Sequence, residues 1–199
     1  MIRRYSANFL AILGIILVSS GIYWGWYNIN QAHQADLTSQ HIVKVLDKSI
    51  THQVKGSENG ELPVKKLDKT DYLGTLDIPN LKLHLPVAAN YSFEQLSKTP
   101  TRYYGSYLTN NMVICAHNFP YHFDALKNVD MGTDVYFTTT TGQIYHYKIS
   151  NREIIEPTAI EKVYKTATSD NDWDLSLFTC TKAGVARVLV RCQLIDVKN

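Results

Sequence analysis

A cysteine and an arginine lie a few residues apart near the end of the chain. Residues Ser176–Cys180 read Ser-Leu-Phe-Thr-Cys, and Arg187 follows across a short turn. A thiol becomes a strong nucleophile as the thiolate, and a fixed positive charge nearby favours that form. The same guanidinium can hydrogen-bond an oxyanion that forms on an attacked carbonyl. The pair therefore predicts a nucleophile at Cys180 with Arg187 as its electrostatic partner.

A histidine ends a second apolar run about sixty residues upstream of the cysteine. Val113–His117 reads Val-Ile-Cys-Ala-His. An imidazole at that position can move protons to and from a reacting amine. Taken singly, Cys180 is more often a buried structural residue and His117 an ordinary histidine at a strand end. Together with Arg187, the three residue types form a set that is typical of a catalytic site.

The elements that must position these residues are short strands. They are separated by turns, and Thr141-Gly142 between two alternating runs predicts a hairpin. Many short strands with close connections favour an all-β domain, either a closed or a nearly closed barrel. Short helices are predicted at Ser92–Ser97 and Phe123–Asn128. The predicted strands are Tyr72–Ile78, Leu81–Val87, Met112–Ala116, Asp134–Thr139, Gln143–Ile149, Leu175–Thr179 and Arg187–Ile195.

The N-terminus carries an apolar stretch that can cross a membrane. Phe9–Tyr27 has no charged residue and spans about 28 Å as a helix, close to the thickness of the hydrocarbon core. Arg3 and Arg4 precede it, so residues 1–8 are predicted to stay in the cytoplasm, with the rest of the chain outside. A cleaved signal peptide ending near Val18–Ser20 is the alternative, but the apolar run and its aromatic end continue past that point.

Residues 28–70 form a polar connection to the domain predicted at 71–199. A short amphipathic helix is plausible over Asp36–Val54, and Gly56–Gly60 reads as a flexible break. The simplest interpretation is an extracytoplasmic stalk. The formal net charge of +2 leaves no sign of a nucleic-acid surface.

The chain has three cysteines, which are too few for a disulfide scaffold. Cys192 is predicted to point into the core, on the face opposite Arg187. Cys115 is predicted to be a small buried residue. A disulfide between Cys115 and Cys180, which would make the site sensitive to redox conditions, stays open at this point.

Four ordered segments resemble sortases, the membrane-anchored cysteine transpeptidases of Gram-positive bacteria. Ser176–Cys180 is similar to the Thr-Leu-x-Thr-Cys signature of that family and departs from it at Ser176. Ala116-His117-Asn118 resembles the family's histidine segment, and Arg187–Val190 resembles the start of the strand after its cysteine loop. Leu76–Val87 resembles its opening strand pair. The resemblance covers residues 72–197 in order, and the N-terminal anchor agrees with it.

The resemblance implies an eight-stranded β-barrel that cleaves a C-terminal Leu-Pro-x-Thr-Gly sorting signal between Thr and Gly. A thioester on Cys180 would be resolved by an amine from a cell-wall precursor or a pilin lysine. His117 would be the acid and base, and Arg187 would bind the oxyanion or the substrate carbonyl. The neighbours Ala116, Asn118 and Thr179 would contact the substrate. No metal or organic cofactor is implied.

Several finer points of this interpretation depend on loops. No Asp-Pro pair occurs in the chain, so the lid of pilin-assembling sortases is absent in its usual form. Residues 154–173 are expected to form a wall over the substrate groove. The segment Asn118–Phe123 either lines that groove or packs on itself. Glu156, Glu161, Asp170 and Asp172 are scattered acids, which are usually solvated and are not expected to bind calcium.

Other classes of protein fit the sequence less well. A cysteine phosphatase needs five residues between its cysteine and arginine, whereas six separate Cys180 from Arg187. A papain-like protease has its cysteine before its histidine in the chain. The serious alternative is a membrane-tethered β-barrel that binds a partner without catalysis, in which Cys180 is merely buried.

Overall fold

The computed structural model describes residues 2–50, 62–164, 173–181 and 184–198. The chain divides into two compact units, Met1–Gln34 and Ala35–Asn199. The helices are α1 (Ile2–Ser49) and α2 (Phe93–Leu96), and short 3₁₀ helices are η1 (Pro79–Leu81), η2 (Tyr107–Thr109), η3 (Phe123–Asn128) and η4 (Ile160–Val163).

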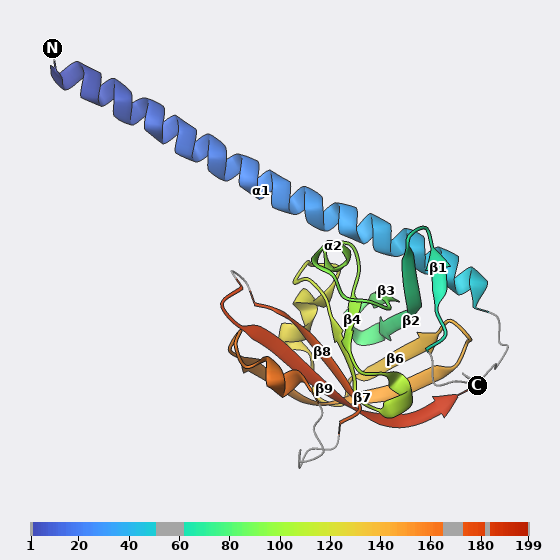
Figure 1. Cartoon of the computed structure of the whole chain (residues 1–199). Coiled ribbons are helices and arrows are strands. Elements are labelled where there is room, and N and C mark those ends of the chain that lie inside the picture. The colour runs from blue at the N-terminus through green and yellow to red at the C-terminus, as the bar shows by residue number, and fades with distance from the viewer. Residues whose placement is uncertain (1, 51–61, 165–172, 182–183, 199) are drawn as a thin grey trace. The chain divides into compact units, whose positions relative to one another are not determined.

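The second unit is built on a sheet that closes on itself (Figure 1). The strand order is β1-β2-β3-β4-β5-β8-β9-β7-β6, and β2 also pairs with β6. The eight strands β2 to β9 therefore form a ring, as the resemblance implies, and β1 adds a short antiparallel edge to β2. The strands are β1 (Lys65–Leu67), β2 (Thr70–Ile78), β3 (Leu83–Ala88), β4 (Thr101–Tyr104), β5 (Met112–Cys115), β6 (Asp134–Thr139), β7 (Ile144–Ile155), β8 (Leu175–Cys180) and β9 (Arg187–Lys198).

The hairpin between β6 and β7 turns where the sequence predicts. Gly142 has φ 91°, a conformation that glycine adopts without steric strain, and its N–H donates to the carbonyl of Thr139 at 3.0 Å. β5 and β8 run parallel, with Cys115 opposite Phe178. β8 and β9 run antiparallel. Parallel β5 and β8 end at the same edge of the sheet, so His117 and Cys180 are brought to one end of the barrel.

The alternation of side chains along these strands produces two separate apolar clusters. The inner cluster fills the barrel and includes Ile114, Leu177, Val190 and Cys192. The outer cluster lies on the opposite face of β5, β8 and β9 and includes Cys115, Phe178 and Leu189. Cys180 and Arg187 alternate with the inner residues and so belong to the outer face.

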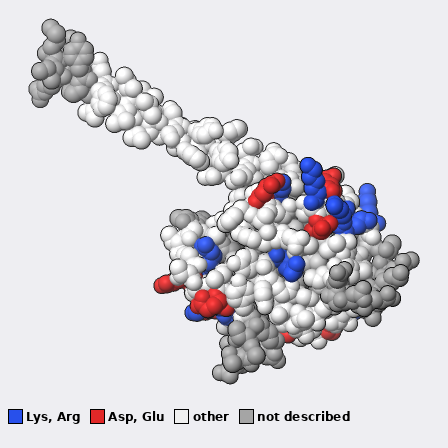
Figure 2. All heavy atoms as spheres, in the orientation of Figure 1, with Lys and Arg blue, Asp and Glu red and all other residues white. Residues whose placement is uncertain are grey.

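The helix α1 has two parts with different surroundings. From Asn8 to Ala35 the sequence contains no Asp, Glu, Lys or Arg, and the described side chains in Figure 2 are accordingly white there. Within the described residues, α1 is the one helix long and apolar enough to cross a membrane. Phe9, Ile15 and Trp24 are among the large apolar side chains that it exposes. The predicted helix over 36–54 is thus the continuation of the apolar helix as far as Ser49.

The part of α1 that belongs to the barrel unit packs one face against it. Ala35, Ser39, Val43 and Leu46 are buried and recur at intervals of three or four residues, as one helical face requires. Leu46 contacts the outer side of the barrel beside Tyr72 and Ala88. The predicted break at Gly56–Gly60 lies outside the described residues.

Candidate active site

The β8–β9 hairpin places Cys180 and Arg187 directly opposite each other. They are the last pair of the antiparallel ladder. Directly opposed residues project from the same face of a sheet, so the thiol and the guanidinium share the outer face. The turn beyond them is closed by Thr181, whose N–H donates to the Ala186 carbonyl at 2.9 Å. Cys180 is half-buried, as a nucleophile that must meet a substrate requires.

Strand β9 carries a second arginine, Arg191, whose partners differ from those of Arg187. Arg191 is buried, pairs with Glu153 at 2.6 Å and donates to the Lys162 carbonyl at 3.1 Å. Its guanidinium also lies 4.6 Å from the centre of the Trp173 ring. Arg187 instead donates from Nη1 to the carbonyls of Gly184 and Ala186, both at 3.1 Å, within the hairpin that carries Cys180.

His117 lies beside Cys180 because hydrogen bonds on both sides of it join the two strand ends. Thr179 Oγ1 donates to the Ala116 carbonyl at 2.8 Å. Asn118 Nδ2 donates to the Thr181 carbonyl at 3.1 Å. These contacts continue the parallel register of β5 and β8 and bracket the His117–Cys180 pair. The structure therefore places the three residues of the predicted set at neighbouring strand ends, and their catalytic roles stay a prediction.

The flanking residues predicted to contact the substrate support the strand ends. Ala116 packs in the inner core, and Thr179 is buried with its hydroxyl bonded to the backbone. Asn118 is half-buried and bonded to the carbonyl of Thr181. A substrate contact at these three positions stays a prediction.

The imidazole of His117 is stacked on an aromatic ring. The ring centroids of His117 and Phe119 are 4.7 Å apart, with 19° between the planes. Partial burial lowers the pKa of His117 below its ordinary value. The folded protein thus holds a neutral imidazole near pH 7, which can accept a proton from a thiol. Of the segment after it, His122 and Phe123 are buried and Tyr121 is exposed, so much of this loop packs on the protein.

The three cysteines are all free, so the alternative disulfide between Cys115 and Cys180 is not formed. Cys115 is buried beside Thr101, with 3.3 Å between Sγ and Oγ1, and burial raises the pKa of its thiol to about 12. Cys192 is enclosed in the inner core as predicted, and burial raises its pKa as well. Cys180 is the one cysteine that combines access with a nearby guanidinium.

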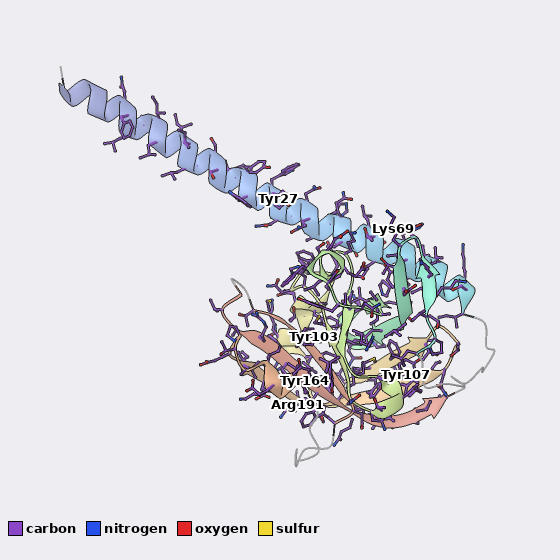
Figure 3. All side chains as sticks on the ribbon, in the orientation of Figure 1. Tyr27, Lys69, Tyr103, Tyr107, Tyr164 and Arg191 are labelled. Carbon is purple, nitrogen blue, oxygen red and sulfur yellow. The ribbon has the colours of Figure 1, made fainter. Side chains whose placement is uncertain are left out.

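An aromatic cluster covers the outer face next to Cys180. Tyr103 lies edge-on to Phe178, with 5.3 Å between ring centroids, and is stacked on Tyr164 at 6.3 Å. Tyr91 packs edge-on against Tyr103 at 5.2 Å. Figure 3 shows the labelled Tyr103, Tyr164 and Arg191 on this side of the barrel. Burial raises the pKa of Tyr91 above its ordinary value.

Sequence reasoning missed this cluster because its members come from four separate segments. The signal was present in the tyrosines at 91, 103, 104 and 164, but their spacing follows no helix or strand period. Of the predicted wall over 154–173, the structure describes 154–164 and Trp173. Its helix η4 packs Ile160 and Val163 on the outer cluster.

The described residues contain no group of three or more His, Cys, Asp or Glu side chains that could hold a metal ion. Glu156 and Glu161 are exposed, while Asp170 and Asp172 lie outside the described residues.

A comparison with models of protein families identifies the domain that carries these residues. Residues 76–195 match the family model of the sortase domain. This match covers more than half of the chain and includes His117, Cys180 and Arg187. The chain belongs to the sortase family. The family supports a transpeptidase activity in general, and the catalytic roles of His117, Cys180 and Arg187 stay a prediction.

Solved sortase structures share the fold. A Clostridium perfringens sortase D5 transpeptidase has a TM-score of 0.62 at 17% identity, with 80% of this chain and 99% of that chain covered. Sortase C1 from Streptococcus suis has 0.54 at 26% identity, covering 63% and 73%. Listeria monocytogenes sortase A has 0.55 at 16% identity, covering 64% and 89%. The chain has no significant match among curated protein sequences. These neighbours belong to three sortase classes, which leaves the subclass open, as the sequence did.

Proposed function

We propose that this sortase cleaves a Leu-Pro-x-Thr-Gly type sorting signal between Thr and Gly and transfers the acyl group to an amine. The observation that carries the proposal is the ladder pair Cys180–Arg187, with His117 bracketed beside the cysteine. A nucleophile, a proton carrier and an oxyanion donor are the three groups that acyl transfer through a thioester needs.

Each residue has a defined role in the proposed reaction. Neutral His117 takes the proton of the Cys180 thiol as the sulfur attacks the threonine carbonyl. Arg187 hydrogen-bonds the resulting oxyanion. His117 then gives its proton to the departing glycine amine, and a thioester remains on Cys180. In the second half, an incoming amine attacks the thioester and gives a proton to His117. The C–S bond then breaks, and His117 returns the proton to the Cys180 sulfur, which restores the thiol.

The family and the apolar helix support a proposal for the acceptor amine and the location. A cell-wall precursor or a pilin lysine would supply the amine. Residues 9–27 would hold the enzyme in the membrane as a single-pass anchor, with residues 1–8 in the cytoplasm. Residues 28–70 would connect the anchor to the catalytic domain at 71–199. The proposed steps use only the side chains of His117, Cys180 and Arg187.

The proposal is tested by peptide ligation with the full chain in detergent micelles. Quenched peptides carrying varied Leu-Pro-x-Thr-Gly type motifs would be incubated with oligoglycine or with a lysine peptide. We expect a product in which the amine is joined to the threonine carboxyl of the peptide. Cleavage at another bond, or no reaction with any motif in a varied library, would contradict the proposed substrate class.

The reactivity of Cys180 toward alkylating reagents would distinguish a transpeptidase from a tethered binding module. If no motif reacts and Cys180 also resists alkylation in the folded protein, the tethered binding module becomes the better interpretation. A groove cysteine reacts with such reagents, whereas a core cysteine does not.

A further inference from the structure

A buried polar contact joins α1 to the loop that follows His117. Ser39 has 1% of its surface exposed, and its Oγ lies 3.2 Å from Nε2 of His122 and 3.2 Å from the carbonyl oxygen of Lys98. His122 is fully buried. A hydrogen bond between neutral buried groups that are 83 residues apart fixes two segments relative to each other.

The partners of Ser39 determine where the protons lie. A carbonyl oxygen only accepts, so the single hydroxyl proton of Ser39 goes to Lys98. Ser39 Oγ therefore accepts from Nε2–H of His122, and the ring is the Nε2–H tautomer. Nδ1 of His122 has no hydrogen-bond partner among the described residues. Burial lowers the pKa of His122 to about 4, and the nearby charge of His117 acts in the same direction. The neutral ring therefore donates its one N–H to Ser39 of α1.

Phe119 connects this contact to the catalytic histidine. Its ring centroid lies 5.6 Å from that of His122 and 4.7 Å from that of His117. The loop is closed by its own backbone, because the N–H of His122 donates to the Phe119 carbonyl at 3.0 Å. The N–H of Phe123 donates to the His117 carbonyl at 3.2 Å. A displacement of His122 would therefore move the face of Phe119 on which the His117 ring rests.

We propose that Ser39 and His122 are positioning residues for catalysis. The C-terminal part of α1 holds His122, His122 fixes the loop, and Phe119 sets the orientation of the His117 ring. The segment between the apolar anchor and the barrel is then part of the support of the active site and does more than separate the two. The inference rests on the proposed role of His117 as proton carrier.

The first test reads the His117 ring directly and needs no substrate. The full chain in detergent micelles, with histidine rings labelled with ¹³C, would be compared by NMR as wild type, Ser39→Ala and Ser49→Ala. Ser49 is a matched control because its hydroxyl bonds only within α1, to the Leu46 carbonyl at 2.9 Å. We expect Ser39→Ala to move the His117 ring resonances away from the position set by the stacked Phe119 ring. Ser49→Ala should leave them in place.

The second test asks whether the effect of Ser39 passes through Phe119. Phe119→Leu removes the aromatic face but keeps an apolar side chain, and it would be combined with Ser39→Ala in a double-mutant cycle. We expect the double variant to match Phe119→Leu alone in its His117 resonances. Independent, additive changes would overturn the proposed connection, and so would a Ser39→Ala spectrum with unchanged His117 resonances.

The kinetics of peptide ligation test the positioning role of Ser39 separately from the proposed function. In the ligation reaction, Ser39→Ala should lower kcat about tenfold or more with KM little changed, because ring orientation matters most in the transition state. A change in KM alone, with kcat as in the wild type, would overturn the positioning role. If the wild type ligates no peptide, the proposed function fails while the NMR comparison still decides whether α1 positions His117.

Discussion

The pairing of Cys180 with Arg187 is the contact on which the proposed chemistry depends. Each residue ends or begins a strand, and the ladder makes them direct neighbours on the outer face. The sequence predicts both residues, because a cysteine and an arginine across a short turn are visible without a structure. It does not show that Arg191 is held by Glu153 and the Lys162 carbonyl, which leaves Arg187 as the arginine of the site.

Replacing Arg187 by lysine tests the need for a guanidinium. Lysine keeps the charge but cannot offer the forked N–H geometry that a guanidinium presents to an oxyanion. We expect kcat/KM for peptide ligation to fall about 10²–10³-fold, the size found for loss of an oxyanion donor. The melting temperature should change little, because Arg187 lies outside the inner core. Wild-type kcat/KM in the Arg187→Lys variant would remove Arg187 from the mechanism.

His122 gives the folded state a dependence on pH. Its pKa is about 4 when folded and about 6.5 when unfolded, so the unfolded chain binds more protons between these values. Its contribution to stability is complete above pH 6.5 and is lost as the pH falls toward 4, by about 3 kcal/mol in total. We expect His122→Gln, which retains an N–H for Ser39, to flatten this part of the curve.

The measurement is the free energy of unfolding of the full chain in micelles between pH 7 and 4. The exposed His41 supplies a control substitution of the same type, His41→Gln, with which the slope of His122→Gln is compared. A wild-type slope in His122→Gln would contradict the low folded pKa.

At the scale of elements, closure of the barrel depends on the pairing of β2 with β6. Gly74 lies opposite Thr139 in this pair, at a shift of register in β2. A Cβ at Gly74 would lie 1.9 Å from the backbone carbonyl oxygen of Thr138. The contact is with backbone, which cannot rotate away as a side chain could. Glycine is therefore required for the two strands to approach.

We expect Gly74→Ala to lower the free energy of unfolding by more than about 2 kcal/mol. Gly132→Ala is the control for backbone strain without a steric clash. Gly132 has φ +79°, but the space around its Cβ position is open. That control should cost about 1–2 kcal/mol. Chemical denaturation of both variants gives the comparison. Equal losses of stability would mean that strand closure does not require the glycine.

The predicted elements and the observed ones differ where the local pattern is weak. The strands whose apolar residues alternate, such as β6 and β8, have nearly the predicted bounds. β4 was not predicted, because it is four residues long and forms a single pair with β3. β7 runs on to Ile155 through an exposed polar stretch at 150–152, where pairing with β9 along the same length overrides the composition.

The contacts of the site that link distant segments could not be predicted from one sequence. Ser39 and His122 are each ordinary polar residues in their local sequence, and only the fold brings them together. The same holds for Tyr91 and Tyr103, which meet beside the site. Local pattern places a residue on a strand or loop, but it does not say which other segment lies next to it.

At the scale of the whole molecule, one helix carries both the apolar stretch and the segment that packs on the barrel unit. The paired arginines at positions 3 and 4 favour a cytoplasmic N-terminus and an extracytoplasmic catalytic domain. Cys180 is a natural reporter of this orientation, because Cys115 and Cys192 are buried.

We expect a membrane-impermeant thiol reagent to label Cys180 on intact spheroplasts that express the chain. In a Cys180→Ala background, the substitution Ser6→Cys should be labelled only after the membrane is made permeable. Cys180→Ala without that second change is the control and should stay unlabelled. Labelling of Ser6→Cys on intact spheroplasts, with Cys180 protected, would reverse the assigned orientation.

The most direct test of the central claim is the mass of the protein during turnover. The full chain in micelles would be mixed with a Leu-Pro-x-Thr-Gly type peptide without an amine acceptor, quenched in acid and digested for mass spectrometry. We expect the acyl part of the peptide, ending in threonine, on the Cys180 peptide. Hydroxylamine or oligoglycine should release it, and Cys180→Ala should carry none. An adduct on another residue, or ligation by Cys180→Ala, would contradict the assignment of Cys180 as the nucleophile.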